Sequence, residues 1–323
     1  STSVEPSEFD LALVAELEAL KDSIDILSVS DEEVADASDR ELQGRISELR
    51  EEQLRDVSGL IHSSILAGFE EIQVPHLTSM DLEAEGEAFG LAELRRLAIE
   101  LYSEDAVDLI RQHVMGIIGQ WDHLVRDYPL QLALFQLGQV YWMSSLFGYS
   151  LRSAERRYSL ERTALLGHHE STVLASSLGE YVSTLTPQEA LLLDSEMSEE
   201  GQRALEYQVS TIIGDLRELW DELLENVGPV LGSAEASNRL RHSIANGEVE
   251  SARITVADLR RIALEGVAFG FLLRKSEEEA ELSHELTRAT GGSQLMVLGA
   301  GSGTSDMTGG VAGKMFRGLR GFS

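Results

Sequence analysis

Hydrophobic residues recur at every third or fourth position along most of the chain, which is the spacing of amphipathic helices. Residues 8–29 show this pattern in an acidic segment. A second run follows the sequence Ser-Asp-Arg-Glu at 38–41, a capping box that predicts a helix start. We expect its apolar face to pack into the core, the alternative being a coiled coil with a partner. The face comprises Leu42, Ile46, Leu49, Val57, Leu60, Ile61, Ile65 and Phe69, and it is interrupted at Gln53.

Residues 129–151 contain no charged side chain, although 25% of the chain is charged. Such a stretch is compatible with a membrane span, a cofactor pocket or the most buried helix of a soluble protein. The glutamine and serine side chains in this stretch are costly to place in a bilayer, which disfavours a single membrane-spanning helix. We therefore predict a buried helix with these core residues: Val140, Met143, Leu146, Phe147 and Leu151.

The end of the neutral stretch recurs further along the chain. The sequence FGYSLRSAERRYSLERT at 147–163 aligns without a gap with FGFLLRKSEEEAELSHE at 269–285. Phe147 and Gly148 match Phe269 and Gly270, and the glycines are expected to allow close helix–helix approach. The further matching pairs are Tyr149/Phe271, Leu151/Leu273, Arg152/Arg274, Glu155/Glu277 and Leu160/Leu282.

The counterpart of the neutral helix, at 255–273, carries four charges and is unsuited to a bilayer. A second pair of similar sequences lies upstream of these two copies. Each is a predicted helix that begins with a serine and two acids and ends in Ile-Ile-Gly, at Gly119 and at Gly214. Ser103 and Ser198 are therefore predicted N-caps with favourable charge in the first turn. The order and spacing of the two echoes predict two copies of one helical module.

The predicted fold is all-α, with two tandem helical modules packed as a multi-helix bundle. We divide the chain into an acidic helical arm, a long helix plus the first module, the second module and a flexible glycine-rich tail. The sequence Thr-Pro-Gln-Glu at 186–189 predicts a further helix start. The stretch 226–255 reads as irregular, with a short strand over 252–255. The divisions are 1–37, 38–175, 176–288 and 289–323.

The formal net charge is −30, with 56 acidic and 26 basic residues. Such a surface repels nucleic acid and disfavours an anionic bilayer. The absence of cysteine removes disulfides, thiolate metal sites and cysteine nucleophiles. The chain begins with Ser1, which is compatible with a mature end left after removal of a targeting peptide or with a cloning boundary.

Motifs that suggest chemistry are incomplete. Gly-Ala-Gly-Ser-Gly at 299–303 has Thr304 where a dinucleotide loop needs its third glycine, and the chain ends nearby. The single Glu281-x-x-His284 lacks the second pair of a di-iron bundle, because Ser159 and Arg162 occupy the equivalent positions. His168-His169-Glu170 reads as a surface loop. We therefore predict no catalytic residue, no metal ligand and no cofactor.

Two sets of charged residues remain as candidate sites. The pairs Arg152/Glu155 and Arg274/Glu277 occur in both copies and predict ion pairs within each module, the alternative being a polar cluster that grips a ligand or partner. Lys314, Arg317 and Arg320 make the glycine-rich end basic, in contrast to the acidic body. These three are the candidate partner contacts, the alternative being a solvated tail.

The sequence LGQVYWMSSLFGYSLRSAERRYSLERT at 137–163 resembles the domain-of-unknown-function family 760, which includes UV-B-induced chloroplast proteins. Further similar segments lie at 42–72, 102–118 and 254–273, so the resemblance covers about residues 42–283. It implies a nuclear-encoded protein imported into the plastid with a transit peptide. It implies no catalytic residue, since none is established for the family.

We expect a non-enzymatic stromal protein that contacts other plastid proteins, in light or UV stress response or in assembly of photosynthetic complexes. One alternative is a peripheral thylakoid protein held by the basic tail or the neutral helix. Another is an enzyme or small-molecule carrier with a pocket between the modules. No nucleic-acid partner is expected, and membrane association is at most peripheral.

Overall fold

The structure is a computed structural model, and its described part is mostly helical, with eight α-helices and one small sheet. The described residues are 39–78, 96–118, 128–166, 175–186, 189, 197–228, 234–281 and 286. The α-helices are α2 (Asp39–Glu71), α5 (Glu104–Ile118), α6 (Leu134–Leu166), α7 (Leu178–Thr184), α9 (Glu199–Ile212), α10 (Leu216–Val227), α11 (Ala234–Asn246) and α12 (Val256–Ala280). A π-helix, η2 (Leu97–Leu101), precedes α5, and the strands are β1 (Pro129–Ala133) and β2 (Ser251–Thr255).

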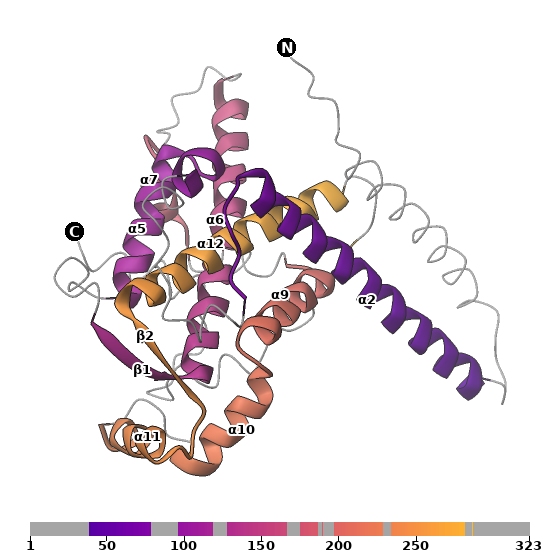
Figure 1. Cartoon of the computed structure of the whole chain (residues 1–323). Coiled ribbons are helices and arrows are strands. Elements are labelled where there is room, and N and C mark those ends of the chain that lie inside the picture. The colour runs from indigo at the N-terminus through magenta and orange to yellow at the C-terminus, as the bar shows by residue number, and fades with distance from the viewer. Residues whose placement is uncertain are drawn as a thin grey trace.

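Helices α6 and α12 cross at the centre of the molecule, and the other described helices surround them (Figure 1). Both crossing helices contribute fully buried aromatic side chains, including Phe147 and Phe269. Helix α2 covers one side of α12, and α5 packs on both crossing helices. Burial of these apolar faces in one continuous core is the main force that holds the helices together.

The described fold is not purely helical, because the neutral stretch begins as a strand. Residues 129–133 form β1, which pairs antiparallel with β2, and α6 starts only at Leu134. The pairing joins Pro129 to Thr255 and Ala133 to Ser251. The strand predicted at 252–255 is therefore present, but its partner was wrongly assigned to a helix.

The neutral helix is buried, although on a face that differs from the predicted one. Phe147 and Leu151 are core residues, whereas Val140, Met143 and Leu146 are only partly buried. The adjoining side of α6 carries buried Tyr141, Ser144, Ser145, Gly148 and Tyr149. Small residues stand at Ser144, Ser145 and Gly148 because the backbone of α12 comes too close there for large side chains. No helix among the described residues is long and apolar enough to cross a membrane.

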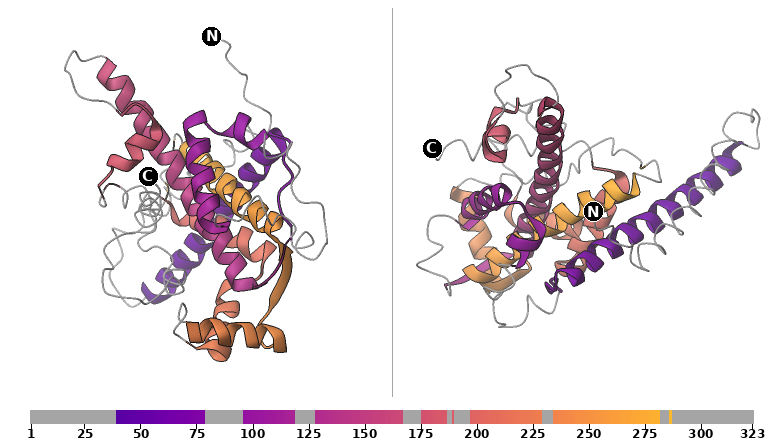
Figure 2. Two further views of the ribbon diagram at one scale, coloured as in Figure 1. Left: turned by 90° about the vertical axis from the view of Figure 1, so that its left-hand side faces the viewer. Right: turned by 90° about the horizontal axis from the view of Figure 1, so that it is seen from above.

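Helix α2 begins at Asp39, next to the predicted capping box, and only its second half is covered. Val57, Ile61, Ile65 and Phe69 are buried, whereas Leu49 is 43% exposed. Figure 2 shows the first half of the helix extending away from the other described helices. The predicted core face therefore serves as a core contact only along part of its length.

Two other expectations concern the connecting segments. The stretch 226–255 is not irregular throughout, because it contains α11, where Leu240 and Ile244 lie one turn apart and face the core. The capping box at 186–189 forms as predicted: the Thr186 amide donates to Glu189 and the Glu189 amide donates to Thr186 Oγ1. The arm at 1–37, the loop motif at 168–170, His284 and the tail at 289–323 lie outside the described residues.

Replacing Thr255 with alanine is expected to lower the free energy of unfolding by about 1 kcal/mol. Thr255 is the N-cap of α12, where its hydroxyl accepts from the Asp258 amide at 3.2 Å and the Asp258 carboxylate accepts from the Thr255 amide at 2.8 Å. Urea denaturation measures the change. The control is Thr211→Ala, which removes the same hydroxyl and methyl groups from an exposed position within α9, where the hydroxyl donates to the Tyr207 carbonyl and caps no helix. Equal stabilities of the two variants would contradict the assignment of the cap.

Candidate functional site

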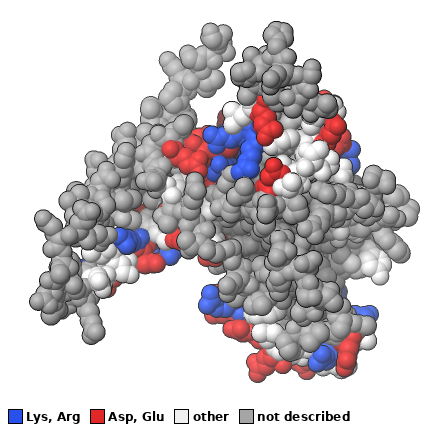
Figure 3. All heavy atoms as spheres, turned by 180° about the vertical axis from the view of Figure 1, so that it is seen from behind, with Lys and Arg blue, Asp and Glu red and all other residues white. Residues whose placement is uncertain are grey.

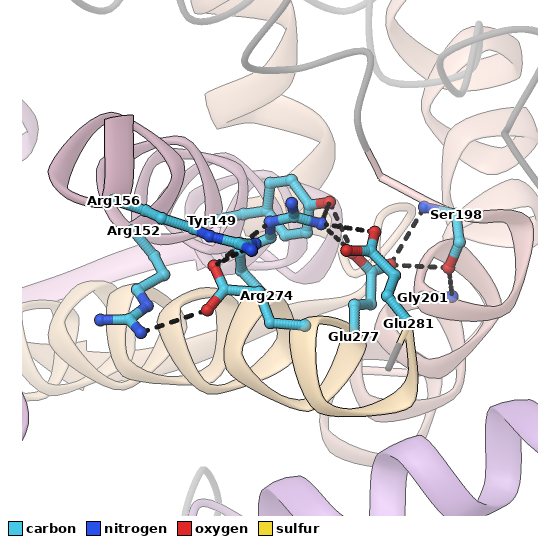
Figure 4. Close-up of polar contacts among 9 residues, drawn as sticks. Tyr149, Arg152, Arg156, Ser198, Gly201, Arg274, Glu277 and Glu281 are labelled. Carbon is cyan, nitrogen blue, oxygen red and sulfur yellow. Dashed lines mark hydrogen bonds and ion pairs between the residues drawn. The ribbon is translucent and has the colours of Figure 1, made fainter. Parts of the chain in front are cut away.

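The most densely connected polar site lies where α6 and α12 cross and meet the first turn of α9 (Figure 4). Its position depends on two glycines. A Cβ atom on Gly148 would collide with the backbone carbonyl oxygen of Val267, and one on Gly270 would collide with that of Ser145. The backbones therefore touch, and this contact brings the polar side chains of the following turns within reach of the opposite helix.

The two glycine contacts are reciprocal in the register of the sequence echo. In that register Gly148 corresponds to Gly270, and Ser145 corresponds to Val267. The strand pairing follows the same register, because Pro129 corresponds to Ser251 and Ala133 to Thr255. The two strand–helix segments thus meet through equivalent positions.

The two arginines of the echo also occupy equivalent places, each over an aromatic ring of the other helix. The Arg152 guanidinium lies 5.3 Å from the centre of the Phe271 ring, and the Arg274 guanidinium lies 5.5 Å from that of Tyr149. Arg274 is nearly fully buried. An arginine stacked on an aromatic face gains a cation–π attraction that increases as water is excluded.

Both predicted ion pairs have their partners in reach. Arg152 Nη1 lies 3.4 Å from Glu155 Oε2, and Arg274 Nη1 lies 3.4 Å from Glu277 Oε2. The structure adds Glu278 of α12, which the sequence comparison missed because its counterpart in α6 is Arg156. Glu278 lies 3.2 Å from Arg152, 3.5 Å from Arg156 and 3.6 Å from Arg274. This carboxylate links the arginines of both helices.

Glu277 occupies the most buried position of the cluster and is completely inaccessible to solvent. Its Oε1 accepts from the Ser198 amide at 3.0 Å and from the Ser198 hydroxyl at 2.6 Å. Its Oε2 accepts from the Tyr149 hydroxyl at 2.5 Å. Gly201 lies against the same carboxylate, where a Cβ would collide with it. The side chain therefore joins the last turn of α12 to the middle of α6 and to the first turn of α9.

The electrostatics of Glu277 result from opposing effects. Burial raises the pKa of its carboxyl group, while the hydrogen bonds from Ser198 and Tyr149 and the charge of Arg274 lower it. Burial also raises the pKa of the Tyr149 phenol far above its ordinary value, and the Glu277 charge adds to this effect. Tyr149 therefore keeps its proton and acts as a hydrogen-bond donor.

Some members of this site were visible in the sequence and others were not. Ser198 was predicted as an N-cap, and its hydroxyl does accept from the Gly201 amide at 2.9 Å. Ser103 likewise accepts from the Ala106 amide. Tyr149 was matched to Phe271 in the sequence, but the role of its hydroxyl was not predicted, because Phe271 has none. Lys314, Arg317 and Arg320 lie outside the described residues, so the structure does not place the candidate partner contacts.

Among the described residues, no group of three or more histidine, aspartate or glutamate side chains has the geometry to hold a metal ion. The acidic side chains at the helix crossing are directed toward arginine, serine and tyrosine donors (Figure 4). On the face shown in Figure 3, described basic and acidic side chains lie beside one another. Charge-assisted hydrogen bonds in this arrangement hold α6, α9 and α12 together.

Residues 41–164 match the model of a family described as protein of unknown function (DUF760). This match confirms the resemblance seen in the sequence over residues 41–164, and it ends before α12. A UV-B-induced chloroplastic protein of Arabidopsis thaliana is 22% identical over 267 residues. That alignment covers 74% of this chain and 63% of the relative, so the two are distant homologues. No solved structure matches the chain.

Proposed function

We propose that this protein is a non-enzymatic chloroplast protein that acts by contacting other proteins. The observation that carries the proposal is that the ionisable side chains at the helix crossing are bound to one another. Arg274, Glu277 and Tyr149 are buried, and each is engaged by the others or by Ser198. Groups held in this way stabilise a shape, whereas a catalytic site must present such groups to a substrate.

We further propose that β1–α6 and β2–α12 are two copies of one strand–helix unit related by an approximate twofold axis. The reciprocal glycine contacts, the strand register and the exchanged arginine–aromatic contacts support this. The modules predicted at 38–175 and 176–288 extend beyond these units. A frame in which two units brace each other offers a rigid support for the segments that contact a partner.

The chloroplast stroma is the proposed location, and its support is the printed name of the Arabidopsis relative, which is chloroplastic and UV-B-induced. A role in light or UV stress response, or in assembly of photosynthetic complexes, agrees with that name. The proposed contact is the basic segment of Lys314, Arg317 and Arg320, because three positive charges in a chain of net charge −30 favour an acidic partner surface.

The test compares partner crosslinking by the full chain with crosslinking by the triple variant K314A/R317A/R320A in chloroplast extract. We expect the variant to lose the crosslinks, and added salt to weaken those of the wild type. The matched control is R45A/R55A/R111A, which removes the same charge from exposed positions in α2 and α5 and is expected to keep them. Identical profiles for both variants would refute the tail contact. Turnover of a metabolite by the purified protein would replace the proposal with an enzyme.

A further inference from the structure

The small sheet of β1 and β2 has one face against the core and one face in solvent (Figure 1). Leu130, Leu132 and Ile254 pack against the hydrophobic core. Gln131 and Arg253 stand opposite each other in the ladder, and both are exposed. This alternation is expected of a sheet that is covered on one side. The exposed face is therefore polar, and Arg253 is the only charged side chain of the two strands.

The hydrogen-bond pattern shows which backbone groups of β2 point away from β1. The Leu134 amide donates to the Glu250 carbonyl at 2.9 Å, directly beside the last pair of the ladder. Bonded and non-bonded pairs alternate along an antiparallel ladder, so Ser251 and Arg253 belong to the non-bonded kind. Their amide and carbonyl groups therefore point outward, along the free edge of β2.

This edge of the sheet is open. In the part of the chain that the structure describes, no hydrogen bond occupies the outward groups of Ser251 and Arg253, and no acid pairs with the Arg253 guanidinium. The outer edge of β1 differs, because Pro129 has no amide proton and the Ala133 amide donates to the Gln136 side chain at 3.2 Å. Prolines and occupied amides hinder the addition of a strand, so β2 is the more open edge.

We propose that the free edge of β2 binds an extended segment of a partner protein as a third, antiparallel strand, with an acidic side chain opposite Arg253. The residue opposite Arg253 would bond to both of its outward backbone groups and place its own side chain beside the guanidinium. Backbone hydrogen bonds then supply affinity, and the charge selects the acid. The proposal rests on the proposed function, contact with other proteins, but uses a surface distinct from the basic segment.

Charge decides among the occupants that such an edge admits. A second copy paired antiparallel about Arg253 would place two guanidinium groups opposite each other, and like charges in that position destabilise a strand pair. The basic segment of Lys314, Arg317 and Arg320 is disfavoured for the same reason. An acidic segment instead supplies the ion pair that Arg253 does not make with the described residues.

Amide NMR of the full chain tests the proposal by titration with the blocked pentapeptide Thr-Val-Asp-Val-Thr and, separately, with Thr-Val-Lys-Val-Thr. The aspartate peptide is expected to shift the Ser251 and Arg253 amide signals and to protect these amides from hydrogen exchange. The lysine peptide is expected to bind about tenfold more weakly, because its charge opposes that of Arg253.

The variant Arg253→Glu is expected to reverse this preference, so that the lysine peptide binds more tightly. The matched control Arg217→Glu makes the same charge change at an exposed position of α10 and is expected to keep the wild-type preference. The variant K314A/R317A/R320A is expected to bind the aspartate peptide as the wild type does, so failure of this proposal and failure of the tail contact are separate results.

Three outcomes would overturn the proposal. The first is equal affinity of the wild type for the two peptides, and the second is binding without a change at the Ser251 and Arg253 amides. The third is protection of these two amides before any peptide is added, which would show that another part of this chain or a second copy already occupies the edge.

Discussion

Replacing Gly270 with alanine is expected to lower the free energy of unfolding by at least about 3 kcal/mol, at or beyond the upper end of the usual cost of overpacking. The added Cβ would collide with the backbone carbonyl carbon and oxygen of Ser145. Side chains can rotate away from a collision, but a backbone carbonyl inside a helix moves only with the whole helix. The two crossing helices must therefore separate, and the contacts beyond the crossing weaken with them.

Gly59 provides the matched control, because it is also a helical glycine but has open space where its Cβ would lie. Gly59→Ala is expected to stabilise the protein by about 0.5–1 kcal/mol through helix propensity. Guanidinium denaturation followed by circular dichroism measures both variants. A Gly270→Ala protein as stable as the wild type would show that the helices do not approach as closely as described.

Glu277→Ala is expected to destabilise the protein by about 3–5 kcal/mol, the usual cost of breaking a buried charged cluster. The change leaves the Ser198 amide and hydroxyl and the Tyr149 hydroxyl without their acceptor. It also creates a cavity between α9 and α12. Glu277→Gln keeps one carbonyl oxygen for Ser198 and is expected to cost less, about 1–2 kcal/mol.

Glu279→Ala is the control for this pair, since its side chain is 53% exposed and its ion pair with Lys275 spans 4.0 Å. A change within about 0.5 kcal/mol is expected there. Thermal unfolding at constant pH and salt compares the three variants. A stability of Glu277→Ala within about 1 kcal/mol of the wild type would contradict the role assigned to the cluster.

The sequence was informative where the physical cause is local. Helical periodicity predicted the long helix that is α2, and the serines followed by acids predicted the caps at Ser103 and Ser198. The recurring Phe-Gly pairs predicted close packing, and both glycines do lie against the opposite backbone. Arginine and glutamate three positions apart on a helix share one face, so their proximity was also predictable.

The rest depends on partners that are distant in the sequence. The sequence of residues 129–133 is as compatible with the start of a helix as with a strand. Only the pairing with residues 251–255 decides between the two. The crossing of the two helices decides which face of α6 is fully buried, which explains why Val140 and Met143 are only partly buried. The contact of Glu278 with both helices, and that of Glu277 with α9, likewise requires the crossing to be known.

The same long-range pairing has a consequence for how the protein is made. Strand β1 and helix α6 obtain their partners only from β2 and α12, more than a hundred residues later in the chain. During synthesis, the small-residue face of α6 stays uncovered until residue 280 has emerged from the ribosome. Such non-local closure is intrinsically slow and leaves apolar surface open to aggregation. The first half of this protein therefore has an exposed apolar face until its last described helix is made.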